Sequence, residues 1–321
     1  MNAPLPTIHT HAPLASVALC AFGLGPLWPE EAAWLDEQRR AQAPELRDAW
    51  RAWLDAPPPA DQGLCQLATR HGLTRAEMVA LALCAAVEID PMVARVLHGL
   101  QSPVSSARPS LGLVVRATLA LDPDDACEAA AHLACLHGGV ARQLGLIELV
   151  GEQGVLVERT LRCAPALALA LAGHEAAWPE ITQPHTEALP LGPGLDAQLR
   201  SQAGSLPGNA QLVLRCAWPE EAWSAAVCVA AQLGLSPVLL AAPLPPGVGV
   251  WLELTRRLPV MACELAPGES RQLAPMPGYS GPVLWLAGMD GTLQAAHAPL
   301  LQCTLPAPAA PERSALWRLH G

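Results

Sequence analysis

The sequence predicts a multidomain protein of mixed α+β and α/β class, in which a winged helix-turn-helix domain precedes a parallel α/β domain. Between residues 61 and 175, short helical patterns with tight connections lead into one β-hairpin pattern. From residue 195 onward, apolar strand-like runs alternate with helical segments, as in a parallel sheet with helices on its faces. The length of 321 residues suits about two domains.

The first 60 residues are predicted to be a helical segment that ends in a linker. Apolar positions spaced along one helix face indicate two helices within residues 29–55, broken at Pro44. Prolines 57–59 form a stiff spacer. We therefore expect residues 1–60 to precede the winged-helix domain as a separate segment.

Residues 61–175 carry the winged-helix pattern. Thr74 and Glu77 form a capping-box sequence that opens a helix through Val87, and Asp90 is expected to cap the helix that begins at Pro91. Further helices are expected at about 110–121, 124–138 and 164–172, and residues 146–150 and 155–159 are expected to pair as a hairpin around 151–154.

The second domain is expected to follow a proline-rich linker at residues 176–194 and to occupy residues 195–321. Its predicted strands are 211–216, 237–241, 259–264 and 282–286, with helices at about 195–202, 219–233 and 249–257. The alternation predicts a largely parallel sheet.

Composition excludes several kinds of chemistry. All 19 basic residues are Arg, so Schiff-base chemistry and the lysines of phosphate loops and kinases are ruled out. The net charge of −10 opposes generic attraction to nucleic acid or to an anionic membrane. Ten scattered cysteines, no basic residue before Arg39 and no apolar run long enough for a bilayer indicate a reduced, cytoplasmic protein.

The turn after the first α/β strand is where a phosphate-binding loop would lie. Aligned on the spacing GxxxxGK[ST], Ala217 and Ala222 take the glycine positions, Trp223 takes the lysine and Ser224 keeps the hydroxyl. Acidic residues 220 and 221 follow at the helix start, where phosphate would sit. The loop is therefore predicted to be degenerate, and no catalytic, cofactor-binding or metal-binding residue is expected.

Other polar groups are weaker candidates. Glu264 is a lone carboxylate after a strand, and Gly278-Tyr279-Ser280-Gly281 does not match a nucleophile elbow. His132, Cys135 and His137 provide too few ligands for zinc, so we expect a buried Cys and surface His there. Residues 61–172 contain eight Arg against eleven Asp and Glu, a net of −3, and Glu152 lies at the predicted hairpin tip. This balance favours protein contact over DNA binding.

Several segments together resemble one bacterial family. They are Arg70–Glu77, Leu81–Pro91, Arg108–Leu113, Leu146–Leu149 and Pro311–Arg318. They are similar to the winged-helix domain before the ATPase module, and to the segment entering the small lid, in an AAA+ family that accompanies phage-tail-like contractile injection systems. The resemblance covers about residues 61–321 and implies a degenerate, P-loop-like AAA-type domain. In that family a degenerate domain precedes an active one, and this chain stops where the active one would begin.

We therefore expect a non-catalytic AAA-like protein, or the N-terminal half of a longer AAA+ ATPase, that acts through protein–protein interaction in assembling or remodelling an injection system. ATPase activity is expected only if an active module follows Gly321. The expected partner is an active AAA+ module in cis or in trans, with no cofactor and no membrane contact. Trp34, Trp50 and Trp53 either contact that partner or pack into their own core. The alternatives are a winged-helix DNA-binding regulator and an enzyme with a Cys- or Ser-based site.

Overall fold

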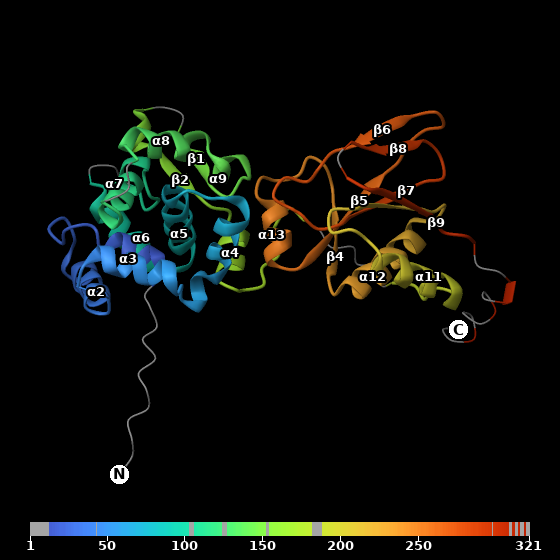
Figure 1. The fold of residues 1–321 in the computed structure, drawn as a ribbon, viewed down its shortest axis with the longest axis horizontal. Helices are drawn as coiled ribbons and strands as arrows, with labels where there is room; N and C mark the ends of the chain where they lie inside the picture. Colours follow the sequence, from blue (N-terminus) through green and yellow to red (C-terminus); the bar gives the residue numbers. More distant parts are fainter. Residues whose placement is uncertain are drawn as a thin grey trace, which may run out of the picture. The chain divides into compact units, whose positions relative to one another are not determined.

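The chain folds into two compact units, residues 1–176 and 177–321 (Figure 1). The computed structural model describes residues 13–42, 44–102, 106–123, 127–151, 154–181, 188–296 and 298–307, with positions 310, 311, 314 and 318. All ten cysteines are free thiols. Within these described ranges, no helix combines the length and apolarity needed to cross a bilayer.

The first unit is built around helix α5 (Arg75–Ile89), which is buried on most of its circumference. The capping box predicted for its start is present, because Thr74 and Glu77 bond reciprocally. Within the described ranges, α5 packs against α1 (Leu14–Leu19), α4 (Gln62–His71), α6 (Pro91–Leu100), α7 (Leu111–Leu121), α8 (Ala129–Gly138), α9 (Val140–Gln143) and α10 (Pro165–Leu171). An apolar helix surrounded in this way is a core element.

The N-terminal helices belong to this same unit. Every residue of α1 is buried, and α2 (Pro29–Arg40) and α3 (Leu46–Asp55) pack with it. A turn of 3-10 helix, η1 (Pro59–Asp61), carries Asp61, whose Oδ2 accepts from the backbone N–H of Leu14 at 2.6 Å and from Nε1–H of Trp53 at 2.7 Å. These bonds tie α1 and α3 into the unit, whereas the sequence suggested that residues 1–60 form a separate segment.

The hairpin differs from its predicted register. β1 (Glu148–Val150) pairs antiparallel with β2 (Thr160–Arg162), so the expected second strand at 155–159 is wrong. That stretch instead contains η2 (Leu156–Glu158), a turn of 3-10 helix with exposed side chains. The physical reason is burial: Leu161 is fully buried opposite Leu149 and takes the core position. The predicted tip residue Glu152 lies outside the described residues.

The second unit contains a five-stranded sheet whose order is β4-β5-β7-β3-β9, with every pair parallel as predicted. Its strands are β3 (Gln211–Arg215), β4 (Ser236–Leu240), β5 (Arg257–Cys263), β7 (Val283–Ala287) and β9 (Leu300–Thr304). If these five strands are renumbered 1 to 5 along the chain, their order across the sheet, read from β9 to β4, is 5-1-4-3-2. The first strand, β3, therefore lies between the fourth and the fifth.

Helices cover one face of this sheet and a small second sheet covers part of the other (Figure 1). Helices α11 (Pro193–Gly204) and α12 (Pro219–Leu233) pack on the first face, and α13 (Val248–Leu254) contacts β5. On the other face, β6 (Ser270–Leu273) and β8 (Thr292–Ala295) form a two-stranded parallel sheet that contributes Leu273 and Leu293 to the core. Neither of these strands, nor β9, was predicted.

Candidate functional site

The candidate site lies at the carboxyl end of β3. In a parallel sheet, ligands bind beyond the carboxyl ends of the strands, where the strand order reverses direction. The chain leaves β3 through α12 toward β4 on one side, while β9 is added on the opposite side. The loop after β3 is therefore the position where a phosphate-binding loop would lie, and the ends of β5 and β7 are its neighbours.

The structure leaves no room for a phosphate-binding loop at this position. Only residues 216–218 separate β3 from α12, which begins at Pro219. Ala222, Trp223 and Ser224 therefore lie within α12, and Ala217 alone of the four aligned residues remains in the connection. A phosphate loop needs a run of non-helical backbone whose N–H groups converge, and here that run is helical.

The individual side chains serve packing. Ala222 is buried, and Trp223 packs against the core formed with α11 and the sheet. Ser224 is buried as well, and its Oγ accepts a hydrogen bond from the backbone N–H of Leu189 at 2.7 Å. The hydroxyl that would bind a metal in a phosphate site is thus engaged with the segment before α11.

The short loop is closed by its own residues. Cys216 Sγ accepts from the backbone N–H of Trp218 at 3.4 Å and donates to Oε2 of Glu221 at 3.5 Å. Burial raises the pKa of the Cys216 thiol. A carboxylate from the first turns of α12 therefore already lies where an anion would bind.

A hollow of about 500 Å³ adjoins the loop, between the ends of β3, β5 and β7. Its lining is mostly apolar, and its charged members are Glu264 and Asp290. Met289 at its rim is 55% exposed, and Trp218 in the neighbouring loop is 66% exposed. Glu264 is exposed, in agreement with the solvated role predicted for it. This lining suits an apolar or cationic group and disfavours phosphate.

Arg215 is not among the residues that line that hollow. Arg215, at the end of β3, is buried and donates to the main-chain oxygens of Gly288, Asp290 and Gly291 at 2.8, 2.9 and 2.8 Å. Its guanidinium fixes the loop after β7, so its donors are used in the fold and not offered to a ligand.

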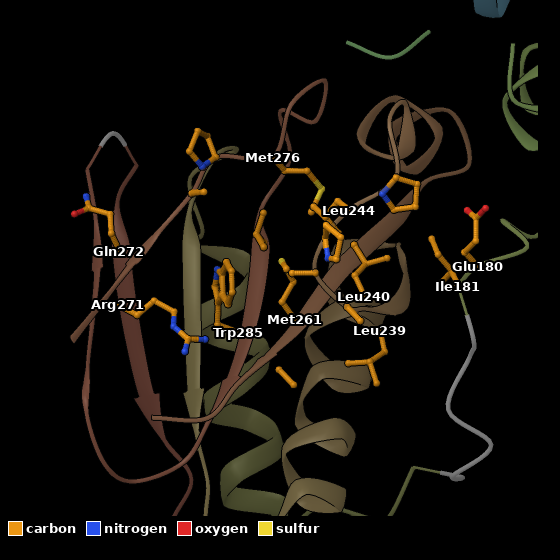
Figure 2. Close-up of a pocket in the computed structure, with 18 residues that line it drawn as sticks. Glu180, Ile181, Leu239, Leu240, Leu244, Met261, Arg271, Gln272, Met276 and Trp285 are labelled. Carbon is orange, nitrogen blue, oxygen red and sulfur yellow. The ribbon is translucent and has the colours of Figure 1, made fainter. Parts of the chain in front are cut away.

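A second groove of about 820 Å³ lies along the opposite face of the sheet (Figure 2). Leu240, Met261 and Trp285 project from the strands into it, and Met276 and Leu244 approach from the loops above. Its walls are largely apolar; Arg271, at the β6 side, is paired with Glu269 at 3.3 Å. The two hollows share Leu239 and Ala262. Nothing in this groove resembles a catalytic constellation.

The surface of the winged-helix unit is apolar where a DNA reader would be basic. Helix α8, which precedes the hairpin, exposes Ala129, Ala130, Ala131, Ala134 and His137. The η2 segment of the wing exposes Val155, Leu156 and Val157 by 58, 36 and 44%. Arg162 on β2 is paired with Glu148, its Nε lying 2.8 Å from Oε2. Helix α8 carries no arginine, and the short α9 between α8 and the wing carries one, the half-buried Arg142.

The histidine and cysteine group of α8 is arranged differently from the prediction. His132 is the buried member, Cys135 is half-buried and His137 is exposed, so the expected buried Cys with surface His is wrong for His132 and Cys135. The helix turns His132 inward because it lies four residues before buried Leu136 on the same face. Within the described ranges, no three His, Cys, Asp or Glu side chains gather in a way that could hold a metal.

The remaining predicted groups have structural partners. Asp90 Oδ1 accepts from the backbone N–H of Met92 at 2.8 Å, which confirms it as the N-cap of α6. Ser280 Oγ donates to Oε1 of Glu253 at 2.6 Å, and Tyr279 OH donates to the main-chain oxygen of Arg257 at 3.2 Å. Ser280 thus lacks the strand–turn–helix setting of a nucleophile elbow.

The tryptophans expected as contact residues are divided by burial. Trp50 and Trp53 are 2 and 1% exposed and stack on each other with centroids 5.5 Å apart, so their role is core packing and the contact hypothesis for them is wrong. Trp34 is half-buried. Trp28, which the sequence interpretation passed over, is 72% exposed. The sequence signal for its exposure was its position directly before Pro29, because a residue before a proline that opens a helix lies outside the helix.

A family model described as "winged helix domain, variant" matches residues 29–135. The match spans α2 through most of α8, and the chain therefore contains a winged-helix domain. No AAA+ family and no contractile-injection family matches the chain. Comparison with curated proteins and with solved structures finds no match.

Proposed function

We propose that this chain, which combines a winged-helix domain with a five-stranded parallel α/β unit, works without catalysis by binding other proteins, as an AAA-like protein or as the N-terminal half of a longer AAA+ ATPase. The observation that carries the proposal is the start of α12 at Pro219, which leaves only three residues between β3 and the helix. A parallel unit with the strand–loop–helix order of a nucleotide-binding domain, but without a phosphate cradle, keeps a shape suited to docking.

The partner we propose is an active AAA+ module, in cis or in trans, within the assembly or remodelling of a contractile injection system. The sequence resemblance supports this partner. Exposed apolar side chains at the candidate site, Trp218 and Met289, support protein contact in general, since such residues are favoured at interface centres.

Nucleotide binding and co-purification test the proposal. The purified chain should show no thermal stabilisation with millimolar ATP and Mg²⁺ and no phosphate release. An affinity-tagged chain expressed in its native host should enrich an ATPase or an injection-system component over an untagged control. Stabilisation by several degrees, or elution of the chain alone, would contradict it.

DNA binding is the second candidate, because winged-helix domains serve that use as well. The apolar wing and the arginine-free exposed face of α8 favour protein over DNA. Titration of labelled duplex DNA with the full chain should show only weak binding at physiological salt. Submicromolar affinity with a steep salt dependence would favour the regulator.

A further inference from the structure

A groove of about 370 Å³ in the first unit lies between the segment leading into α2 and one face of α6. Leu27 and Trp28 line it from one side, and Arg95, His98 and Gly99 line it from the other. Trp28 is 72% exposed, although indole is the side chain that gains most from burial. The groove shares no residue with the candidate site in the second unit.

One wall of this groove contains a buried carboxylate with an unused acceptor. Glu31 is 3% exposed, and its Oε1 accepts from Nε of Arg95 at 2.7 Å. Its Oε2 is buried and has no hydrogen-bond partner within the part of the chain that the structure describes. An unsatisfied buried polar atom is costly, and more so when it is charged. Glu31 is among the residues that line the groove, so a donor that enters it and displaces the side chains covering Oε2 reaches this acceptor.

The charge around the groove favours a cation. Arg95 Nη2 also bonds Oε2 of Glu30 at 2.6 Å, so two carboxylates share one guanidinium and leave one net negative charge. The face of an indole attracts cations, and the indole of Trp28 lines the groove with most of its surface exposed. The chain as a whole carries a net charge of −10, which steers basic partners toward it.

We propose that this groove holds an arginine side chain presented by a partner protein. Its guanidinium donates to Oε2 of Glu31, and its aliphatic stem lies against Leu27 and Trp28. Arginine fits better than lysine because a planar guanidinium stacks on an indole while it donates in its own plane to a carboxylate. The proposal deepens the proposed function, on which it rests, by assigning a contact to the partner.

The direct test is a titration of the full ¹⁵N-labelled chain with N-acetyl-arginine amide, followed at the backbone amide of Gly99 and the indole of Trp28. N-acetyl-citrulline amide, of the same shape but uncharged, is the matched ligand. We expect saturable shifts with the arginine compound and affinity lower by about tenfold or more with the citrulline compound. Glu31→Gln should weaken arginine binding at least about fivefold, whereas Glu37→Gln, an exposed position on the same helix, should leave it unchanged.

Equal response to both compounds, or no change in Glu31→Gln, overturns the proposal. Because Glu31 is buried, the exposed variant Trp28→Ala, read at Gly99, decides the question if Glu31→Gln does not fold. Unchanged affinity in Trp28→Ala overturns it equally. If a partner co-purifies equally with the wild-type and the Trp28→Ala chains, the proposed function is supported, but the groove is not part of the contact with that partner. Failure to find any partner contradicts the proposed function. In that case the titration with the arginine compound still shows whether the groove binds an arginine side chain.

Discussion

The buried carboxylate of Glu77 accepts a hydrogen bond from the backbone N–H of Ala141, 64 residues later, at 2.7 Å. That bond uses Oε1; Oε2 accepts from the backbone N–H and the hydroxyl of Thr74 at 2.8 and 2.9 Å. One side chain therefore satisfies donors at the starts of α5 and α9. Glu77, which was predicted from local sequence to be part of a capping box, therefore also links the start of α5 to the start of α9 within the first unit.

Replacing Glu77 should destabilise the first unit well beyond the loss of a cap. Glu77→Ala removes a capping interaction worth about 1 kcal/mol and leaves the buried Ala141 N–H without an acceptor, at about 1–3 kcal/mol. We expect a total loss of about 2–4 kcal/mol in urea unfolding, with Glu77→Gln also destabilising because an amide NH₂ replaces one acceptor oxygen. Glu37→Ala, at an exposed position of α2, is the control. An equal loss of stability in that variant would contradict the account.

Asp61 should make stability depend on pH. Burial raises the pKa of the Asp61 carboxyl above its ordinary value, against the opposing hydrogen bonds from Leu14 and Trp53. The native state therefore favours the neutral acid more than the unfolded chain does. The resulting stabilisation is fully present below the unfolded-state pKa of about 3.9 and is lost as pH rises through the folded-state pKa.

The variant Asp61→Asn tests this dependence. Both hydrogen bonds end on one oxygen of Asp61, so the asparagine oxygen can accept both without a buried charge. The free energy of unfolding of the variant should equal that of the wild type near pH 3.5. At higher pH the variant should be the more stable of the two, by a difference that grows with pH and then levels off. Urea midpoints across this range give the comparison, with Asp61→Ala expected to be less stable throughout. If the stability difference between Asp61→Asn and the wild type shrinks as pH rises, the pKa of Asp61 is lowered in the native state and the account is contradicted.

The strands of the second unit could be predicted where burial is continuous. All five residues of β3 are buried, and such runs stand out in sequence. β6 buries only Leu273 and β8 only Leu293, so their sequences read as polar loops. The wing was misassigned because 155–159 has strand composition, whereas the position that fills the core is Leu161.

The candidate sites were predictable in chemistry but not in geometry. The absence of lysine already excluded the lysine of a phosphate loop. The early start of α12 had a local signal in Pro219, a residue favoured at the first helical position. The burial of Glu31 had none, because acidic residues at a helix start are ordinarily solvated and only the packing of α2 against α6 encloses this one.

Gly249 on α13 should tolerate no side chain. A Cβ built there would lie 2.0 Å from the carbonyl oxygen of Pro277. Alanine in a helix is ordinarily better than glycine by about 1 kcal/mol, but this contact should reverse the sign and cost about 1–3 kcal/mol or more. Gly204→Ala at the end of α11, where nothing lies within 4 Å, is the matched control and should be neutral or slightly stabilising in thermal unfolding. Equal melting temperatures for the two variants would contradict the predicted clash.

Restoring the residue types of a phosphate loop should not restore nucleotide binding. The triple variant Ala217→Gly/Ala222→Gly/Trp223→Lys supplies both glycines and the lysine, yet α12 still begins at Pro219. The backbone between the two glycines therefore stays helical and does not form the loop whose N–H groups converge on a phosphate. We expect no heat of ATP binding by calorimetry in Mg²⁺, with Trp223→Ala as the control for lost packing and circular dichroism as the check on folding. Binding at micromolar ATP would contradict this prediction. It would mean that the backbone rearranges readily and that only the identities of the substituted residues prevent ATP binding in the wild type. Continued absence of binding would locate the loss in the three-residue connection, where helix geometry and not side-chain chemistry decides what the sheet can hold.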